Sequence, residues 1–246
     1  QLARQGNTKV LKLNNGRLVY DASRSTVSAI DNSPMTYNII TTPKGGPYQL
    51  TLPDGSKVWL NSASSLKFPT VFKGNGREVE LSGEGYFEIE GNANMPFTVI
   101  VNKMKVQVLG TRFNIMAYWD ESTVNTTLLQ GALQVAEGDL VKRLIPGQQA
   151  VLTISGHKLA VQQADIQKVM AWKNGVFEFD NTVMPTIMRQ LGRWYDIDVQ
   201  FKVKADMPEL GGSISKKLNL SQVLNLLEKN GINHFTIEGK KVTVLP

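Results

Sequence analysis

The fold of the carboxy-terminal part is decided by the stretch WKNGVFEFDNTVMPTIMRQLGRWYDIDVQF, which runs from Trp172 to Phe201. It begins with a strand pattern, VFEF, continues with apolar residues at helical spacing in VMPTIMRQLGRWY, and ends with a second strand pattern, IDVQF. The stretch therefore predicts a strand, a helix and a strand, placed behind a long segment that contains no comparable helix.

A second copy of this plan follows, with GSIS as a strand, NLSQVLNLLEKN as a helix and HFTIE as a strand, before a last strand in KKVTVL. The apolar positions of the copies align as Met184 with Leu220, Ile187 with Val223, Met188 with Leu224, Leu191 with Leu227, Val199 with Phe235 and Phe201 with Ile237. Each helix is expected to place one apolar stripe against a sheet. Two such βαβ units predict a small α+β domain with its helices on one sheet of about four or five strands.

The preceding segment, from Val10 to Thr153, reads as short strands separated by turns. Asn15-Gly16 and Asp54-Gly55 are hairpin signals, because these pairs supply the positive φ angles of tight turns. In REVELSGEGYFEIE the pattern predicts two strands joined by a turn at Gly83 and Gly85, and LNSASSLKFP is interpreted as a loop that ends at Pro69.

The predicted fold class is therefore mainly β plus α+β: an antiparallel β-sandwich or stacked β domain, followed by a small duplicated βαβ domain. A short helix from Asp165 to Trp172, ending near Gly175, is expected at the junction.

Composition limits the function classes. The chain has 246 residues, 41% hydrophobic and 20% charged, which is ordinary for a globular protein and argues against disorder. The net charge is +6, but basic and acidic residues are interspersed and no basic motif occurs, so we expect no nucleic-acid binding. Zero cysteines exclude disulfides and cysteine zinc sites, and they fit either a reducing cytosol or a compartment where stray thiols are a liability.

The ends of the sequence and its apolar runs bear on the membrane. No apolar run approaches the roughly 18 residues that cross a bilayer. The sequence opens with QLARQGNTKV and has no initiator Met, so we expect that an upstream segment has been removed.

The residues that could carry catalysis do not form a convincing set. Glu84, Glu88 and Glu90 are close in sequence, and a glycosidase would need two carboxylates across a cleft. Glu88 and Glu90 alternate with Phe87 and Ile89, which places both carboxylates on the solvent face of a strand.

Other catalytic and metal patterns are missing. The two histidines, His157 and His234, fall in different predicted domains, and no G-x-S-x-G nucleophile motif occurs. The sequence therefore predicts no catalytic residue, no metal, no cofactor and no enzyme.

Five residues are candidates for binding a partner: Trp194, Tyr195, Lys240, Lys241 and Val242. Trp194 and Tyr195 end the first repeat helix, where one is expected to pack over the sheet and the other to lie nearer the surface. Lys240 and Lys241 begin the last strand, which is interpreted as a sheet edge. Lysines there either guard against aggregation or flank a strand-addition site. As an alternative function, Trp59, Tyr86 and Trp119 leave open a carbohydrate-binding β module, although each lies in a strand-like segment that could equally be core.

Several segments resemble one family, the FecR-type anti-sigma factors, particularly those of Bacteroidetes. These segments are TTPKGGPYQLTLPDGSKVWLNSASSLKFP, GEGYFEIE, VLGTRFNI, LLQGALQV, IPGQQAVL and the stretch from Trp172 to Phe201. The likeness extends over nearly the whole chain from about Thr36. The resemblance divides the chain into a variable membrane-proximal β segment at 1–35, an all-β FecR-type domain at 36–164 and an α+β domain at 165–246. This last domain is similar to the short domain shared by secretins and TonB-dependent receptors.

The resemblance also implies a role. FecR-type proteins are single-pass inner-membrane proteins that control an extracytoplasmic-function sigma factor through a cytoplasmic segment and read the signalling domain of an outer-membrane TonB-dependent transducer in the periplasm. The sigma-binding segment and the membrane helix are not in this sequence, so it is similar to the periplasmic sensor only. We therefore expect the domain from roughly Lys173 to Pro246 to bind the transducer through an exposed strand or helix face, with no role for nucleic acid.

Overall fold

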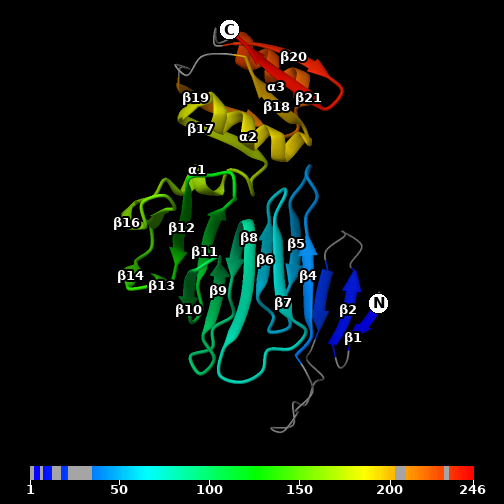
Figure 1. Ribbon diagram of the computed structural model, residues 1–246. Helices are drawn as coiled ribbons and strands as arrows, with labels where there is room; N and C mark the ends of the chain where they lie inside the picture. The colour runs from blue at the N-terminus through cyan, green and yellow to red at the C-terminus, as the bar shows by residue number, and fades with distance from the viewer. Residues whose placement is uncertain (1–2, 6–7, 13–17, 22–34, 203–208, 230–232) are drawn as a thin grey trace. The chain divides into compact units, whose positions relative to one another are not determined.

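The computed structural model describes residues 3–5, 8–12, 18–21, 35–202, 209–229 and 233–246 (Figure 1). The chain divides into two compact units. The first comprises Gln1–Thr42 and Pro47–Ile166, and the second comprises Pro43–Gly46 and Gln167–Pro246. The mainly β class predicted from the sequence is confirmed, since strands account for most of the elements.

The first unit is built from sixteen strands among its described residues. These are β1 (Ala3–Gln5), β2 (Thr8–Lys12), β3 (Leu18–Asp21), β4 (Tyr37–Thr41), β5 (Tyr48–Thr51), β6 (Lys57–Leu60), β7 (Ser65–Pro69), β8 (Arg77–Glu88), β9 (Phe97–Val101), β10 (Met104–Val108), β11 (Arg112–Ala117), β12 (Thr123–Gln130), β13 (Leu133–Glu137), β14 (Leu140–Leu144), β15 (Gln148–Thr153) and β16 (Lys158–Gln163).

Two sheets share strand β8 (Figure 1). One runs in the order β1-β2-β3-β5-β6-β8-β11-β12-β15-β16, and the other contains β4, β7, β8, β9, β10, β13 and β14. Most neighbours are antiparallel, as predicted, but β3 and β5 pair in parallel, and so do β8 and β9. The predicted hairpin at Asn15-Gly16 joins β2 and β3, which pair antiparallel, but the turn itself lies outside the described residues.

One cluster of buried side chains from both sheets forms the core of this unit. Its strands alternate buried and accessible residues, as β10 does from Met104 to Val108, because successive side chains of a strand point to opposite faces. Phe87 and Phe113 lie opposite each other on β8 and β11, with parallel rings whose centroids are 5.0 Å apart. This stacked pair is part of the hydrophobic core of the first unit.

Strand β8 differs from the sequence prediction, because it is one strand from Arg77 to Glu88 and has no turn at Gly83 and Gly85. Its first half pairs with β7 and β9, and its second half pairs with β6 and β11. Gly83 lies at the transition with a φ of +86°, a conformation that side chains disfavour. The glycine that suggested a turn thus allows one strand to leave one sheet and enter the other.

The interpretation of LNSASSLKFP as a loop is also wrong, because its second half forms β7 between β4 and β8. Leu66 and Phe68 are fully buried and alternate with Ser65 and Lys67, which are half-buried. Pro69 ends the strand opposite Tyr37. The strand was missed because serines precede it and because its apolar pattern consists of only two residues, Leu66 and Phe68.

The second unit follows the predicted element order. It contains α1 (Ile166–Met170), β17 (Val176–Val183), α2 (Met184–Tyr195), β18 (Asp198–Phe201), β19 (Glu209–Ser215), α3 (Leu220–Lys229), β20 (His234–Glu238) and β21 (Lys241–Leu245). Helix α2 has Pro in its first turn, where its missing N–H costs nothing. Helix α3 begins with reciprocal bonds between Asn219 and Gln222, 2.9 and 3.0 Å long, which satisfy two N–H groups at its start.

The strands of this unit do not form the single predicted sheet. β17 pairs with β19 in a two-stranded sheet, and β18, β21 and β20 form a three-stranded one, in that order. The first strands of the two copies thus pair with each other, while the second strands flank the last strand. The predicted apolar stripes are confirmed, because Ile187, Met188 and Leu191 of α2 are fully buried, and Val223, Leu224 and Leu227 of α3 are buried.

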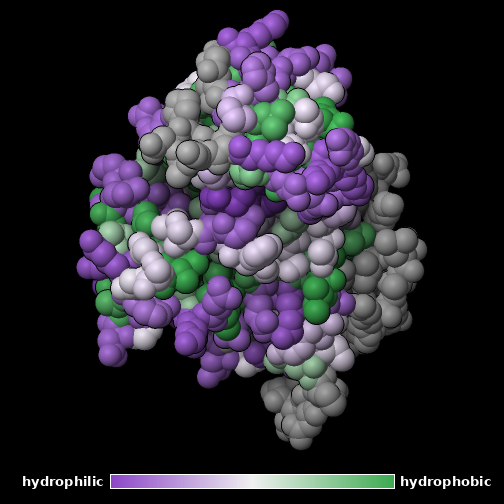
Figure 2. Space-filling view, turned by 45° about the horizontal axis from the view of Figure 1, so that its top comes forward, coloured by the Kyte–Doolittle hydropathy of each residue, from purple (hydrophilic) through white to green (hydrophobic). Residues whose placement is uncertain are grey.

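Within the described residues, no helix is both long enough and apolar enough to span a lipid bilayer. On the face seen in Figure 2, the hydrophobic side chains form scattered groups separated by hydrophilic ones.

Candidate partner-binding surface

Strand β18 forms an open edge of the three-stranded sheet, since in the described part of the chain it pairs with β21 alone. The Asp198 N–H donates to the Lys240 carbonyl at 2.8 Å, and the Lys202 N–H donates to the Val244 carbonyl at 2.9 Å. Because hydrogen-bonding direction alternates along a strand, the backbone groups of Val199 and Phe201 point away from β21. We refer to Val199, Phe201 and these outward backbone groups as the β18 edge.

The β18 edge combines hydrogen-bonding groups with an aromatic side chain. Phe201 is 39% exposed at the end of the strand. At the opposite side of the same sheet, the Phe235 N–H of β20 donates to Glu228 Oε1 at 2.8 Å. The carboxylate therefore already occupies a donor that an added strand would use on β20, and β18 is the more open edge.

The interpretation of the last strand as an edge is wrong. β21 lies between β18 and β20, and Val242 is fully buried. Two neighbours use its backbone groups, and its side chain faces the core, so a partner strand cannot pair with it. Chain order misled the interpretation, because the last strand in sequence is the central strand in space.

Lys240 and Lys241 stand where β21 begins. The Lys240 ammonium forms an ion pair with Asp196, and Lys44 lies 3.3 Å from the same carboxylate. The hydrogen bond from Lys240, followed by that from Lys44, lowers the pKa of the Asp196 carboxyl, while the bond to Asp196 raises the pKa of Lys240. Lys241 is exposed. Lys240 thus helps to hold the turn between α2 and β18.

The Pro43–Gly46 segment contacts the same turn through a hydrogen bond and an ion pair. The Gly45 N–H donates to the Arg193 carbonyl near the end of α2 at 3.3 Å, next to the ion pair of Lys44 with Asp196. Asp196 itself caps α2 with a φ of +54°, a left-handed conformation that Asp tolerates better than most residues. Residues distant in sequence therefore meet at the turn that leads into β18.

Trp194 and Tyr195 are both half-buried and pack against the core of the second unit. The Trp194 ring meets Phe177 edge-on, and the Lys216 ammonium lies 4.5 Å from the centre of the indole. The Tyr195 hydroxyl donates to the Leu218 carbonyl at 2.7 Å, and burial raises the pKa of this phenol. The prediction that one of the two rings packs and the other lies nearer the surface does not hold, because both are half-buried and contact neighbouring residues.

Glu84, Glu88 and Glu90, the carboxylates considered for a glycosidase, lie in different environments. Glu84 is buried and accepts hydrogen bonds from the amides of Asn61 and Asn114 at 2.8 and 3.1 Å. Glu88 accepts a bond from the Tyr86 hydroxyl at 3.3 Å, and Glu90 is exposed. The predicted alternation is confirmed, since Phe87 and Ile89 are buried between them.

The three aromatic residues of the carbohydrate alternative differ from one another. Trp59 and Tyr86 are cross-strand neighbours on β6 and β8, with ring centroids 5.4 Å apart. Tyr86 is buried, and burial together with the nearby Glu88 raises the pKa of its phenol to about 12. Trp119 lies in the turn between β11 and β12 and is 90% exposed, although its sequence context resembled a strand.

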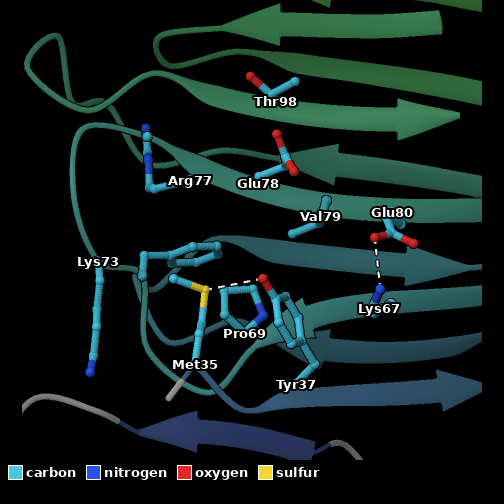
Figure 3. A pocket seen from close by; sticks show the side chains of 12 residues that line it. Met35, Tyr37, Lys67, Pro69, Lys73, Arg77, Glu78, Val79, Glu80 and Thr98 are labelled. Atoms are coloured by element: carbon cyan, nitrogen blue, oxygen red, sulfur yellow. Dashed lines mark hydrogen bonds and ion pairs between the residues drawn. The ribbon is translucent and has the colours of Figure 1, made fainter. Parts of the chain in front are cut away.

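No group of three or more His, Cys, Asp or Glu side chains that could hold a metal ion occurs among the residues that the structure describes. A shallow pocket of about 270 Å³ lies on the face of β4, β7, β8 and β9 (Figure 3). Tyr37, Pro69 and Met35 line one side of it, and the ion pair of Lys67 with Glu80, 2.8 Å long, lies beside them. This lining brings no nucleophile and base together.

Sequence reasoning missed the β18 edge. Phe201 and Ile237 were aligned as equivalent apolar positions of the two copies, and they are 39% and 42% exposed. The shared signal was an apolar residue late in a strand, which does not distinguish a central strand from an edge. The pairing order of the strands was the missing information.

The chain is similar to known proteins in both units. A family model described as FecR protein matches residues 38–134, and one described as FecR, C-terminal, matches residues 176–244. The comparison with curated proteins finds no match. Two crystal structures of a candidate anti-sigma factor from Parabacteroides distasonis ATCC 8503 share 28% sequence identity with the chain. The match to the first covers 84% of this chain and 98% of the solved chain, with a TM-score of 0.77. The match to the second covers 85% of this chain and 99% of the solved chain, with a TM-score of 0.78.

The two family matches lie in order and together span more than half of the sequence, and the solved structures resemble the chain over most of its length. We conclude that this chain belongs to the FecR family of anti-sigma factors, a family of regulatory proteins that act on sigma factors.

Proposed function

We propose that the chain is the periplasmic sensor region of an anti-sigma factor anchored in the inner membrane. In this role it binds the signalling domain of a TonB-dependent outer-membrane transducer and controls an extracytoplasmic-function sigma factor through segments outside this sequence. The family supports the regulatory part of this role. The observation that carries the binding part is the open β18 edge, which lies in the unit matched by the FecR carboxy-terminal model.

Binding by strand addition suits this edge. An extended segment of the transducer would accept and donate main-chain hydrogen bonds at Val199 and Phe201. The Phe201 ring is already partly exposed and would supply apolar contact area, which usually dominates the affinity of such interfaces. An interface of about 1,200 Å² is expected for a transient signalling contact.

The turn before β18 offers a route by which binding could be relayed. Asp196 contacts both Lys240, at the start of β21, and Lys44. Lys44 lies in the Pro43–Gly46 segment, which is covalently continuous with β4 and β5 of the first unit. A partner that shifts β18 would therefore change the ion pairs of Asp196 and the tension on this segment.

Titration with the isolated signalling domain of the transducer tests the proposal. We expect Phe201→Asp to weaken binding by at least about tenfold, because it replaces an aromatic anchor with a charge at the interface. Ile237→Asp is the matched control, since Ile237 is the equivalent residue of the second copy, is 42% exposed and lies on the other edge strand. Equal losses in the two variants, or none in Phe201→Asp, would place the transducer elsewhere.

Glycan binding is a second candidate function, and Trp119 is the observation that favours it. An indole that is 90% exposed on a turn can stack on the face of a sugar ring. Calorimetric titration with a panel of oligosaccharides tests this candidate. A response abolished by Trp119→Ala would support it, and no heat with any glycan would remove it.

A further inference from the structure

We propose that the free edge of β4 in the first unit is a self-association site, at which the β4 strands of two copies of this chain pair antiparallel about a two-fold axis. This site is separate from the β18 edge and does not depend on the proposed transducer.

The backbone of β4 has a free side. Within the described residues β4 pairs with β7 alone. The Thr70 N–H donates to the Thr36 carbonyl at 2.9 Å, and the Thr42 N–H donates to the Ser64 carbonyl at 2.8 Å. Even-numbered residues therefore face β7, and the N–H and C=O groups of Tyr37, Ile39 and Thr41 point outward.

The side chains of the same three residues are exposed. Ile39 is 68% exposed, Tyr37 is 51% exposed, and Thr41 is also exposed. An added strand would thus meet hydrogen-bonding groups and an uncovered apolar surface at the same residues. A lone exposed isoleucine is common, but one on an unpaired edge is unusual, because such edges favour aggregation.

β4 is distinguished from the other edges of its unit by its lack of charge. Its sequence is YNIIT, whereas β14 carries Lys142 and Arg143, and β16 begins with Lys158. Charged residues on an edge normally prevent pairing with another chain. That protection is present on β14 and β16 and is missing on β4.

The sequence of β4 is complementary to itself. In an antiparallel pair centred on Ile39, the two Ile39 residues lie opposite each other, Tyr37 lies opposite Thr41 of the second copy, and Asn38 lies opposite Ile40. Ile39, Tyr37 and Thr41 then occupy hydrogen-bonded positions, which yields about six inter-chain N–H···O bonds. Aromatic and β-branched residues form favourable cross-strand pairs, and no like charges meet. A strand without charge has no means of selecting an acidic or basic partner, which favours a second copy.

The neighbouring side chains do not oppose this pairing (Figure 3). The Tyr37 hydroxyl donates to Met35 Sδ at 3.1 Å, and the Lys67 ammonium lies 5.0 Å from the centre of the Tyr37 ring. The same ammonium is paired with Glu80. In the dimer the two Lys67 residues would lie about 14 Å apart across four strands, which is beyond the screening length of physiological salt.

The dimer should be weak. One short strand pair with its flanking side chains buries less than the roughly 1,200 Å² of a standard interface. We therefore expect monomer and dimer to exchange, with the dimer growing as the protein concentration rises.

Cross-linking of single-cysteine variants tests the register, because the chain has no cysteine of its own. Opposed residues at a hydrogen-bonded position have Cα atoms about 5.5 Å apart, so a short bifunctional thiol reagent can join two cysteines placed there. With this reagent, Ile39→Cys should form a cross-linked dimer at least about tenfold faster than Val141→Cys. Val141 is the matched control, since it is 51% exposed on the charged edge strand β14.

Sedimentation of the full chain tests the dimer itself. We expect the dissociation constant to rise at least about tenfold in Ile39→Lys, which brings two charges together at the axis, and to remain unchanged in Val141→Lys. A wild-type chain that stays monomeric up to about 1 mM would overturn the proposal. So would equal cross-linking rates of the two cysteine variants. A monomeric chain whose binding to the transducer domain is lost in Ile39→Lys would assign the β4 edge to that partner and would likewise overturn self-association.

Discussion

Replacing Gly83 by alanine should destabilise the first unit more than replacing a glycine at an open turn does. Gly83 lies in β8 where the strand passes from one sheet to the other, with a φ of +86°. A Cβ at this position would lie 2.4 Å from Ser64 Oγ and 2.8 Å from both Ser64 Cα and Cβ. Rotation of the serine side chain cannot relieve the contact with Cα.

Three costs add up in this variant. The positive φ costs a residue with a side chain about 1–2 kcal/mol. Moving the backbone around Ser64 to admit one methyl group costs about 1–3 kcal/mol, as overpacking in a dense core does. The shift also disturbs the bond from the Glu84 N–H to Ser64 Oγ, 2.8 Å long, which contributes about 1 kcal/mol. We therefore expect the free energy of unfolding to fall by about 4 kcal/mol.

Gly74→Ala separates the backbone cost from the packing cost. Gly74 has a φ of +76°, and nothing lies within 4 Å of the position its Cβ would occupy. This variant should lose only about 1–2 kcal/mol, and the gain from a stiffer unfolded chain is the same in both variants and cancels. The difference between the two variants, about 2–3 kcal/mol, measures the contact with Ser64.

Urea unfolding followed by far-UV circular dichroism gives both values, with tryptophan fluorescence to detect separate transitions of the two units. In thermal unfolding the difference corresponds to roughly 4–12 °C for a domain of this size. If the two variants lose stability within about 0.5 kcal/mol of each other, the close approach of β8 to Ser64 does not stabilise the fold, and steric contact is not the reason for glycine at position 83.

Three further outcomes are expected. Leu191→Ala, which removes a fully buried side chain of α2, should lower the stability of the second unit by about 3 kcal/mol in urea unfolding and leave the first unit unchanged. Tyr86 should ionise well above an ordinary phenol in an absorbance titration, near its pKa of about 12. Because this pKa is raised in the folded state, its stabilising effect is complete below about pH 10 and is lost as the pH rises toward 12, and Tyr86→Phe should remove that loss. The pKa of Asp196 is lowered by Lys240 and Lys44, so its stabilising effect is present above about pH 4 and is lost at lower pH. Asp196→Asn should flatten the acid dependence of stability, and an unchanged acid limb would show that these ion pairs contribute nothing.

The repeated plan of the second unit could be predicted because helical spacing and strand spacing of apolar residues are both local features of the sequence. Helical spacing fixed α2 and α3, and the residues of the predicted stripes, such as Ile187, Leu191 and Leu227, are buried. Which strand pairs with which is not a local property. The copies exchange partners, so that β17 pairs with β19, and β21 separates β18 from β20. The pattern of apolar residues along one strand would be the same in the single sheet that was predicted and in the two sheets that are observed.

The two errors in the first unit have a common cause. Gly83 and the serines before Leu66 were interpreted by their usual preference for turns and loops, and both lie at one point of close approach. There Ser64 Oγ accepts the Glu84 N–H, and Gly83 leaves room for Ser64. Each residue makes sense only with its neighbour from a distant part of the sequence, so neither could be interpreted alone.

The candidate surfaces were also missed because strand pairing depends on residues that are distant in sequence. Lysines drew attention to the last strand, but charged residues on a strand most often mark an edge that is protected from pairing, or a central strand whose first residue reaches solvent. An edge that is meant to pair should lack that protection. β4 has no charged residue. β18 has one, Asp198 at its first position, and its outward backbone groups belong to the uncharged Val199 and Phe201. We therefore expect uncharged residues on open strands to be a better guide to the contacts of this protein than its lysines are.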